Sequence, residues 1–281
     1  MDTNITPIFV VGSPRSGTSL AAAYLCTSRA VADFGELGVF AFTRRVARRE
    51  FERVQSPLKD VYLAELDQHA IDFVLREARA TGARYFCDST PWNLHVIDYL
   101  REIFPHALFI LTIRHYAGVI QSLERSYHDG WKWAGPSATD RALIWSRAYK
   151  KVTGLPMDRT ITLGYDRLCQ NPSVAISDFI DRLALAGFPV SELCLSAFAE
   201  SHATTSPRRT VAVRTSGGPV TLHSMQSFDP ECWRVEDEQQ VRPIVADCEH
   251  VLRALFPTDY SVPEAWKFSS RGAEGDSLIA Q

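Results

Sequence analysis

The chain has 281 residues, of which 46% are hydrophobic and 11% aromatic, and its formal net charge at pH 7 is −3. This composition supplies enough apolar side chains for a packed core and excludes a disordered or fibrous chain. The slight negative charge disfavours a nucleic-acid binder, and no apolar stretch approaches the roughly 18 residues that span a bilayer. We therefore expect a globular protein with no nucleic-acid or membrane partner.

The cysteines and the N-terminal residues indicate the cellular compartment of the protein. Residues 1–6 show no cationic start followed by an apolar run, so no signal peptide is predicted. The six cysteines are widely spread and include no Cys-x-x-Cys pair, which suits neither a disulfide scaffold nor a zinc site. These features predict a cytoplasmic protein with reduced cysteines and no metal.

Short apolar runs alternate with helical patterns along the chain, which is typical of an α/β fold with a mainly parallel central sheet flanked by helices. Strands are expected over residues 8–11, 84–87, 108–113 and 160–163. Helices are expected over residues 19–25, 91–104, 116–128, 139–153, 173–186 and 235–256, with a helical insertion over 37–81 that Gly82 ends. Residues 201–232 are interpreted as an ordered loop or a lid. One domain over 1–268 and a disordered tail over 269–281 complete the prediction.

The clearest chemical signal is the segment 12–19, Gly-Ser-Pro-Arg-Ser-Gly-Thr-Ser, between the first expected strand and the first helix. A glycine turn that leads into a helix presents free backbone N–H groups to an anion, and the helix dipole adds to the attraction. Gly17 lets the backbone approach a ligand, while Thr18 and Ser19 add hydroxyl donors. Thr18 stands where a nucleoside-triphosphate loop carries lysine, and Arg15 supplies the positive charge instead. An ordinary strand-to-helix turn of small residues is the alternative interpretation.

The segment from Pro14 to Ser19 resembles the 5′-phosphosulfate loop of the sulfotransferases that use 3′-phosphoadenosine 5′-phosphosulfate (PAPS). A second match follows about a hundred residues later. The expected strand 108–113 ends in Arg114, and Ser122 lies eight residues further on, an arrangement similar to the family's 3′-phosphate motif. A cation at a strand end and a hydroxyl on the next helix can hold one phosphate from two sides.

Three further segments support the resemblance, in the right order and within residues 7–256. Residues 88–93, Asp-Ser-Thr-Pro-Trp-Asn, are similar to the family's Lys-Thr-Pro segment. Residues 165–168, Tyr-Asp-Arg-Leu, resemble its Tyr-Glu-Asp-Leu segment, and residues 232–234, Cys-Trp-Arg, resemble the Trp-Arg of many bacterial members. The resemblance implies a sulfotransferase fold, similar to that of P-loop NTPases, with a helical insertion.

The chain also departs from the family pattern. Leu20 stands in place of a tryptophan that stacks on adenine, and Ser89 stands where many relatives have lysine. The segment that caps the 3′-phosphate in the animal enzymes is not recognisable. Arg208, Arg209 or Arg214 can substitute for it, and the sequence does not choose among them.

The resemblance implies transfer of a sulfuryl group from PAPS to an acceptor hydroxyl or amine by in-line displacement, with no metal and no covalent intermediate. It assigns donor binding to the residues Arg15, Ser16, Gly17, Thr18, Ser19, Arg114, Ser122 and Tyr165. Arg15 is also assigned a catalytic role, because its charge neutralises the leaving 5′-phosphate oxygen.

An acceptor hydroxyl also needs a general base. Glu36 is the first candidate, because several relatives carry a catalytic glutamate after the first helix. Its carboxylate lies among apolar neighbours in the sequence, which favours a raised pKa. A helix-capping role is the alternative for Glu36. His95, in the expected helix 91–104, is the rival base, because the animal enzymes use a histidine from the corresponding region.

The predicted partner is a small-molecule acceptor, as in specialised metabolism, and a homo-oligomeric state stays open. Two other functions also stay open. One is a P-loop kinase or other phosphoryl transferase with a displaced lysine, which requires Mg²⁺ and a nucleoside triphosphate. The other is a nucleotide-binding protein of the same fold that has lost the base and does not catalyse.

Overall fold

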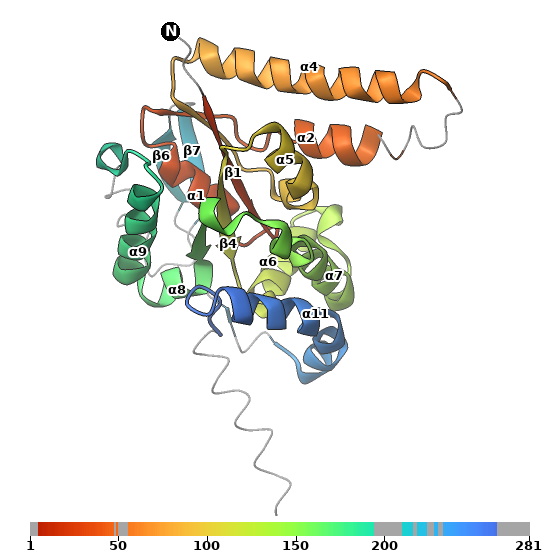
Figure 1. The fold of residues 1–281 in the computed structure, drawn as a ribbon. Coiled ribbons are helices and arrows are strands. Elements are labelled where there is room, and N and C mark those ends of the chain that lie inside the picture. Colours follow the sequence, from red (N-terminus) through yellow and green to blue (C-terminus); the bar gives the residue numbers. More distant parts are fainter. Residues whose placement is uncertain are drawn as a thin grey trace, which may run out of the picture.

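The structure is a computed structural model that describes residues 5–47, 49, 56–193, 210–215, 218–223, 228–229 and 233–262. A parallel five-stranded sheet with the order β2-β3-β1-β4-β5 forms its centre (Figure 1). The strands are β1 (Thr6–Gly12), β2 (Val31–Asp33), β3 (Tyr85–Asp88), β4 (Leu108–Ile113) and β5 (Thr160–Gly164). The chain runs from β1 to one side of the sheet and then to the other, so a crevice lies at the carboxyl ends of β1 and β4, where such folds bind ligands.

The central strands are apolar along their whole length because helices cover both faces of the sheet. All six residues of β4 are buried, and Val10 of β1 pairs with Ile110. Alternate residues of β1 enter two separate cores: Phe9 and Val11 enter one, and Ile8 and Val10 enter the other. A continuous apolar run is therefore the sequence signal of a strand that is buried on both faces.

Each core is closed by its own set of helices (Figure 1). The core around Ile8 is covered by α1 (Thr18–Leu25), α8 (Tyr165–Gln170) and α9 (Pro172–Leu185). The core around Phe9 is covered by α4 (Lys59–Ala80), α5 (Ile97–Ile103), α6 (Tyr116–His128), α7 (Ala138–Tyr149) and α11 (Val235–Leu255). No helix of the described ranges is long and apolar enough to cross a bilayer.

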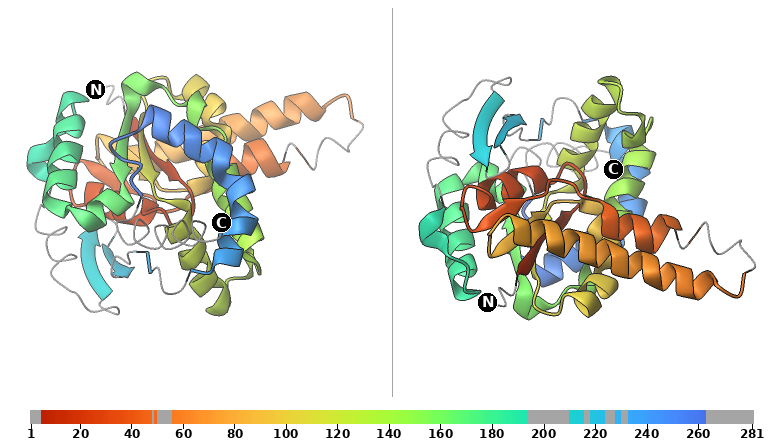
Figure 2. Two further views of the ribbon diagram at one scale, coloured as in Figure 1. Left: turned by 90° about the horizontal axis from the view of Figure 1, so that it is seen from below. Right: turned by 90° about the horizontal axis from the view of Figure 1, so that it is seen from above.

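The helical insertion projects from the body of the molecule, as Figures 1 and 2 show. It is not continuous over 37–81 as predicted: it comprises α2 (Val39–Ala41), the π-helix η1 (Phe42–Ala47) and, after a break, α4. One face of α4 is buried through Leu63, Ala70, Val74 and Ala78, and Gly82 follows the helix with φ +71°, as predicted. Apolar residues at helical spacing indicate this helix, but such spacing cannot show where a π-helix interrupts the insertion.

Several other predicted boundaries are wrong. The three residues of β2 were not expected, because so short an edge strand gives no alternation to detect. The expected helix 91–104 begins as the 3₁₀ helix η2 (Pro91–Val96), and the expected helix 139–153 ends at Tyr149. The predicted loop 201–232 contains an antiparallel hairpin of β6 (Thr210–Thr215) and β7 (Gly218–His223). The predicted tail 269–281 lies outside the described residues.

Further 3₁₀ turns connect these elements: η3 (Lys132–Ala134), η4 (Val152–Gly154), η5 (Met157–Arg159) and η6 (Val190–Glu192). Cys26, Cys87, Cys169 and Cys248 carry free thiols, as predicted for these four positions.

Candidate functional site

The loop between β1 and α1 folds tightly on itself. The Ser16 amide and the Ser16 hydroxyl both donate to the Ser13 carbonyl, at 3.1 and 2.6 Å. Gly17 is the N-cap of α1 with φ +98°, a conformation that glycine adopts without strain. Arg15 has φ +69° and is the only non-glycine residue with positive φ in the described part of the chain. Backbone strain of this kind is frequent at functional sites, which makes the loop a candidate for one.

A hydrogen bond fixes the loop between β1 and α1 to the neighbouring strand β4. The Ser16 and Thr112 hydroxyls lie 2.7 Å apart, and Thr112 belongs to β4. A Cβ atom at Gly12 would lie 2.5 Å from the Thr112 hydroxyl, so only glycine fits there. Close packing of β1 and β4 thus sets the position of the loop relative to the end of β4.

The two predicted phosphate motifs meet at this point. The Arg15 Nε atom donates to the Ser122 hydroxyl at 3.1 Å, although the residues are 107 positions apart. The Arg114 Nη1 atom donates to the Arg15 carbonyl at 2.9 Å. The Arg114 guanidinium also lies 4.2 Å from the centre of the Tyr165 ring, and a Cβ atom at Gly17 would lie 2.7 Å from that ring. The fold therefore brings Arg15, Gly17, Arg114, Ser122 and Tyr165 together.

The charges at this point favour an anion. Burial lowers the pKa of Arg15, and the nearby positive charge of Arg114 lowers it further, while Tyr165, Asp129 and Glu36 act in the opposite direction. Two guanidinium groups in one crevice, beside the N-terminus of α1, create a local positive potential. Of the remaining predicted donor-binding residues, Ser16 and Thr18 are buried and Ser19 is exposed.

Two side chains that were not predicted to belong to the site fix the backbone at Arg114 and His115. The Trp145 indole donates to the Arg114 carbonyl at 3.0 Å, and Asp166 accepts from the His115 amide at 2.6 Å. Burial raises the pKa of Asp166 to about 6, against the opposing effect of Arg114. The Tyr-Asp pair after β5 was a signal for this role, since it places a carboxylate one residue beyond Tyr165.

Glu36 lies in the loop after β2, at the same edge of the sheet. Glu36 is exposed, yet partial desolvation of its carboxylate raises its pKa, and the negative charge of Asp88 raises it further. Arg15 opposes this shift, which places Glu36 within electrostatic reach of the phosphate loop. Glu36 therefore has the position and the raised pKa that suit a general base.

The rival candidate His95 lies on η2, half-buried, with its ring stacked on Trp92 at 5.7 Å between centroids. Glu36 interacts electrostatically with two other elements, through Asp88 at the end of β3 and Arg15 in the loop before α1. Of the arginines considered as phosphate caps, Arg208 and Arg209 lie outside the described residues, and Arg214 lies in β6.

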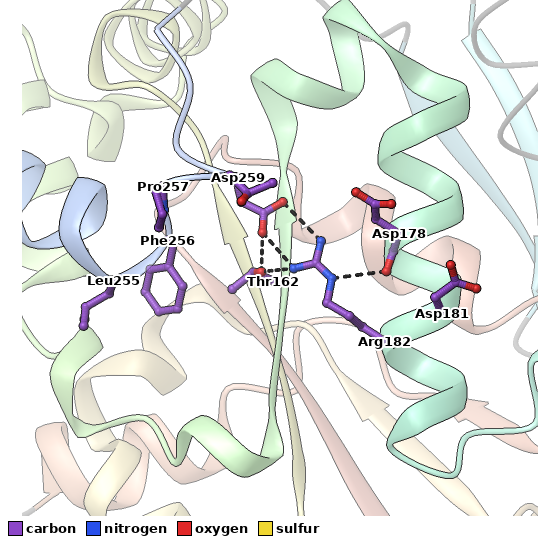
Figure 3. A pocket seen from close by; sticks show the side chains of 9 residues that line it. Thr162, Asp178, Asp181, Arg182, Leu255, Phe256, Pro257 and Asp259 are labelled. Carbon is purple, nitrogen blue, oxygen red and sulfur yellow. Dashed lines mark hydrogen bonds and ion pairs between the residues drawn. The ribbon is translucent and has the colours of Figure 1, made fainter.

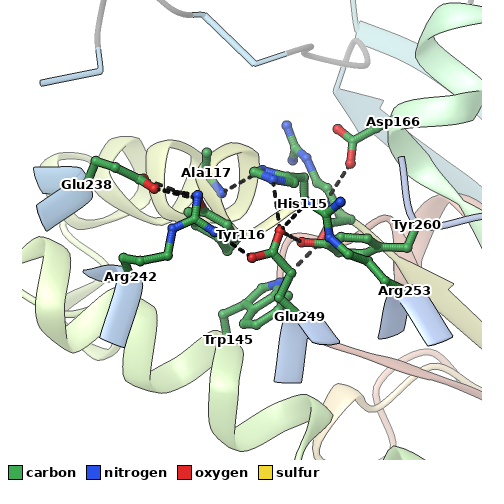
Figure 4. A network of polar contacts seen from close by, with 11 residues as sticks. His115, Tyr116, Ala117, Trp145, Asp166, Glu238, Arg242, Glu249, Arg253 and Tyr260 are labelled. Atoms are coloured by element: carbon green, nitrogen blue, oxygen red, sulfur yellow. Dashed lines mark hydrogen bonds and ion pairs between the residues drawn. The ribbon is translucent and has the colours of Figure 1, made fainter. Parts of the chain in front are cut away.

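A network of paired charges surrounds His115, the residue after Arg114 (Figure 4). His115 is buried and caps α6 by accepting from the Ala117 amide through Nδ1, and its Nε2 atom lies 3.7 Å from Glu249. Burial, together with the charges of Arg253 and Arg242, lowers the pKa of His115 to about 3, so the ring is neutral.

A cavity of about 460 Å³ lies elsewhere, between α9, β5 and the turn after α11 (Figure 3). The Arg182 Nη1 atom donates to Asp259 at 2.8 Å, and the Thr162 hydroxyl donates to the same carboxylate at 2.5 Å. These contacts fasten the turn after α11 to β5. The cavity contains none of the predicted site residues.

The protein belongs to the sulfotransferase family: the model of a family described as the Sulfotransferase family matches residues 7–189. This match contains both phosphate motifs and most of the sheet. It confirms the family that the motifs indicated and establishes that the chain is of a transferase family.

Two curated relatives are both named protein-tyrosine sulfotransferase 1. The protein of Danio rerio is 33% identical over 122 residues, which cover 41% of this chain and 34% of the relative. The protein of Rattus norvegicus is 29% identical over 126 residues, which cover 43% and 34%. The matched segment thus spans about a third of the length of these relatives.

Solved structures share the fold. A sulfotransferase domain from the curacin biosynthetic pathway superposes with a TM-score of 0.54 at 14% identity, covering 86% of this chain and 97% of that domain. A sulfotransferase from Alicyclobacillus acidocaldarius gives a TM-score of 0.51 at 13% identity, covering 93% and 98%. The predicted α/β sulfotransferase fold is confirmed.

Proposed function

We propose that the protein transfers the sulfuryl group of PAPS to a hydroxyl or amine of a small-molecule acceptor. The observation that carries this proposal is the contact between the two phosphate motifs, through Arg15 with Ser122 and Arg114 with the Arg15 carbonyl. A ligand with a phosphosulfate at one end and a phosphate at the other needs two anion sites at a fixed separation. A nucleoside triphosphate places its anionic groups in one chain and needs only the first.

The crevice residues fit such a donor. The first amides of α1 and the Thr18 and Ser19 hydroxyls bind the 5′-phosphosulfate, and Arg114 with Ser122 binds the 3′-phosphate. Arg15 neutralises the charge that develops on the leaving oxygen as the bond from sulfur to that oxygen breaks. Glu36 accepts the proton of the acceptor while its oxygen or nitrogen bonds to sulfur. The products are the sulfated acceptor and adenosine 3′,5′-bisphosphate.

Charge and the named relatives guide the choice of acceptor. A net charge of −3 does not attract a polyanion, which supports a small molecule rather than an acidic polysaccharide. Because the curated relatives are named protein-tyrosine sulfotransferases, a tyrosine peptide belongs in the acceptor panel beside small phenols, alcohols and amines.

Calorimetric titration with adenosine 3′,5′-bisphosphate, beside ATP with Mg²⁺, tests the donor. We expect tight binding of the bisphosphate and little response to ATP, because Thr18 replaces the lysine that bridges the terminal phosphates. Preference for ATP would instead make the protein a phosphoryl transferase, and binding of neither ligand would refute a donor site.

A Glu36→Gln variant then separates catalysis from binding. We expect it to bind the bisphosphate like the wild type but to transfer sulfate from PAPS to the best acceptor of the panel about 10²–10⁴-fold more slowly. His95→Gln is the matched variant of the rival base. Unchanged turnover in Glu36→Gln with a large loss in His95→Gln would transfer the role of base to His95.

A further inference from the structure

The loop that carries Glu36 is fastened along its length to the end of β3. The Phe34 amide donates to the Cys87 carbonyl at 3.0 Å, and the Ser89 amide donates to the Gly35 carbonyl at 2.8 Å. These two bonds continue the pairing of β2 with β3 beyond the ends of both strands. They fix the start of the loop but leave the part beyond Glu36 to other contacts.

The buried carboxylate of Asp88, the last residue of β3, holds that second part. It accepts hydrogen bonds from the Thr90 amide at 2.9 Å, the Thr90 hydroxyl at 2.6 Å and the Asn93 side-chain amide at 2.8 Å, and also from the Leu37 amide. The Thr90 hydroxyl in turn accepts from the Gly38 amide at 2.8 Å. Asp88 therefore holds both residues that follow Glu36, one directly and one through Thr90.

The hydrogen bonds of Asp88 favour its ionised form. The backbone amides of Thr90 and Leu37 can only donate, Asn93 donates through Nδ2, and the Thr90 hydroxyl, which accepts from Gly38, directs its single proton to Asp88. Burial raises the pKa of this 0% exposed carboxylate, and each of these hydrogen bonds opposes the rise by stabilising the negative charge.

We propose that Asp88 is a positioning residue of the sulfuryl-transfer site: its carboxylate fixes the loop that presents Glu36 and supplies negative charge within electrostatic reach of that side chain. This inference rests on the proposed role of Glu36. Asp88 acts on the reaction through Glu36 and does not itself take up the acceptor proton.

Two charged groups act on Glu36 in opposite directions: Asp88 raises its pKa and Arg15, from the phosphate loop, lowers it, while burial adds to the effect of Asp88. A general base near an arginine loses basicity, so a second carboxylate nearby offsets that loss. Arg15 can therefore lie beside the leaving group while Glu36 remains basic enough to accept a proton.

The test measures Glu36 directly and needs neither donor nor acceptor. Glutamate labelled with ¹³C at the side-chain carboxyl is incorporated, the Glu36 resonance is assigned by its loss in Glu36→Gln, and its titration is followed by NMR. Amide hydrogen exchange of Leu37 and Gly38 is measured in parallel. In Asp88→Asn we expect the Glu36 titration midpoint to fall by about 0.5 pH unit and both amides to exchange about tenfold faster.

Thr90→Val is the second variant, because it removes the link to Gly38 but keeps the charge of Asp88. We expect faster exchange of the Gly38 amide with less than half of the midpoint shift seen in Asp88→Asn. Asp98→Asn, which removes an exposed carboxylate of α5, is the matched control and should change neither reading.

The proposal is overturned if either the Glu36 midpoint or the Leu37 and Gly38 exchange of Asp88→Asn stays at the wild-type value. If Asp88→Asn does not fold, Thr90→Val decides, and unchanged Gly38 exchange overturns the proposal. Failure of the proposed function has a different signature, because it shows as no bisphosphate binding or as full turnover in Glu36→Gln.

Discussion

Arg114 and His115 are consecutive residues that face two regions with opposite charge balance. Arg114 turns to the phosphate loop, where a second guanidinium, that of Arg15, lies beside it. His115 turns to α11, where Glu249 binds Arg242 and Arg253 at 2.7 and 2.8 Å (Figure 4). The end of β4 thus lies between two regions. Around Glu249, negative charge is paired with two arginines, whereas at the phosphate loop two arginines lie close together.

The pKa values express the same difference. Burial and Arg114 lower the pKa of Arg15. Burial also acts to lower the pKa of Arg242, but Tyr116 and Glu238, with Glu249, outweigh it and raise the pKa. Matched ion pairs stabilise the fold by themselves, whereas two neighbouring cations gain most when an anion binds between them. The contrast supports the proposed anion site on the loop side of β4.

The largest effect is expected at the phosphate loop. Arg15→Ala should lower the rate of PAPS consumption by about 10²–10³-fold, because the variant lacks a cation at the leaving oxygen. The Kd of adenosine 3′,5′-bisphosphate should rise by less than about tenfold. Arg84→Ala, which removes an exposed arginine paired with Glu192, is the control. Equal losses in rate and affinity would leave Arg15 a binding residue only.

The network of paired charges around His115 should respond in stability rather than in binding. Glu249→Ala leaves Arg242, Arg253 and Tyr260 without their shared acceptor, and chemical denaturation should show a loss of about 2 kcal/mol, since the two arginines are half-exposed. Glu77→Ala, on the exposed face of α4, should change stability little. Weakened bisphosphate binding in the folded Glu249→Ala protein would contradict the separation of the two regions.

A smaller effect is expected where α6 contributes to the 3′-phosphate site. Ser122→Ala should raise the Kd of adenosine 3′,5′-bisphosphate by about 3–10-fold, the value of one hydrogen bond to a charged ligand, and should leave 5′-AMP binding unchanged. Ser126→Ala is the matched control one turn later, since its hydroxyl donates to the Ser122 carbonyl. Equal effects of Ser122→Ala on both nucleotides would remove Ser122 from the 3′-phosphate site.

The smallest effect concerns the Arg182–Asp259 contact at the cavity of Figure 3. Burial acts to raise the pKa of Asp259, but the hydrogen bonds from Arg182 and Thr162 outweigh it and hold the pKa below its ordinary value. Its contribution to stability is therefore present above about pH 4 and is lost as the pH falls through the lowered pKa. Asp259→Asn should lose less stability than the wild type between pH 5 and pH 3, as followed by urea denaturation. Parallel pH profiles would contradict a matched pair.

A feature that depends on a single stretch of the chain could be predicted from that stretch alone. The apolar runs predicted β1 and β4, the glycine pattern predicted the loop and its arginine, and the spacing of Arg114 and Ser122 predicted the second anion motif. The hairpin of β6 and β7 and the edge strand β2 were missed. Their pairing depends on partners elsewhere in the chain, and short segments of mixed polarity carry little periodic signal.

The sequence by itself determined the fold class, because hydrophobic period and turn chemistry are local properties, and its motifs indicated the family by resemblance. Only the tertiary structure decided how the motif residues meet: Arg15 contacts Ser122 and Arg114 contacts the Arg15 carbonyl, while Glu36 comes within electrostatic reach of Asp88. These contacts join segments that are distant in the chain, and they form because the carboxyl ends of parallel strands come together at one edge of the sheet. The local charge of each region depends on which segments come together there, and no single segment of the sequence specifies it.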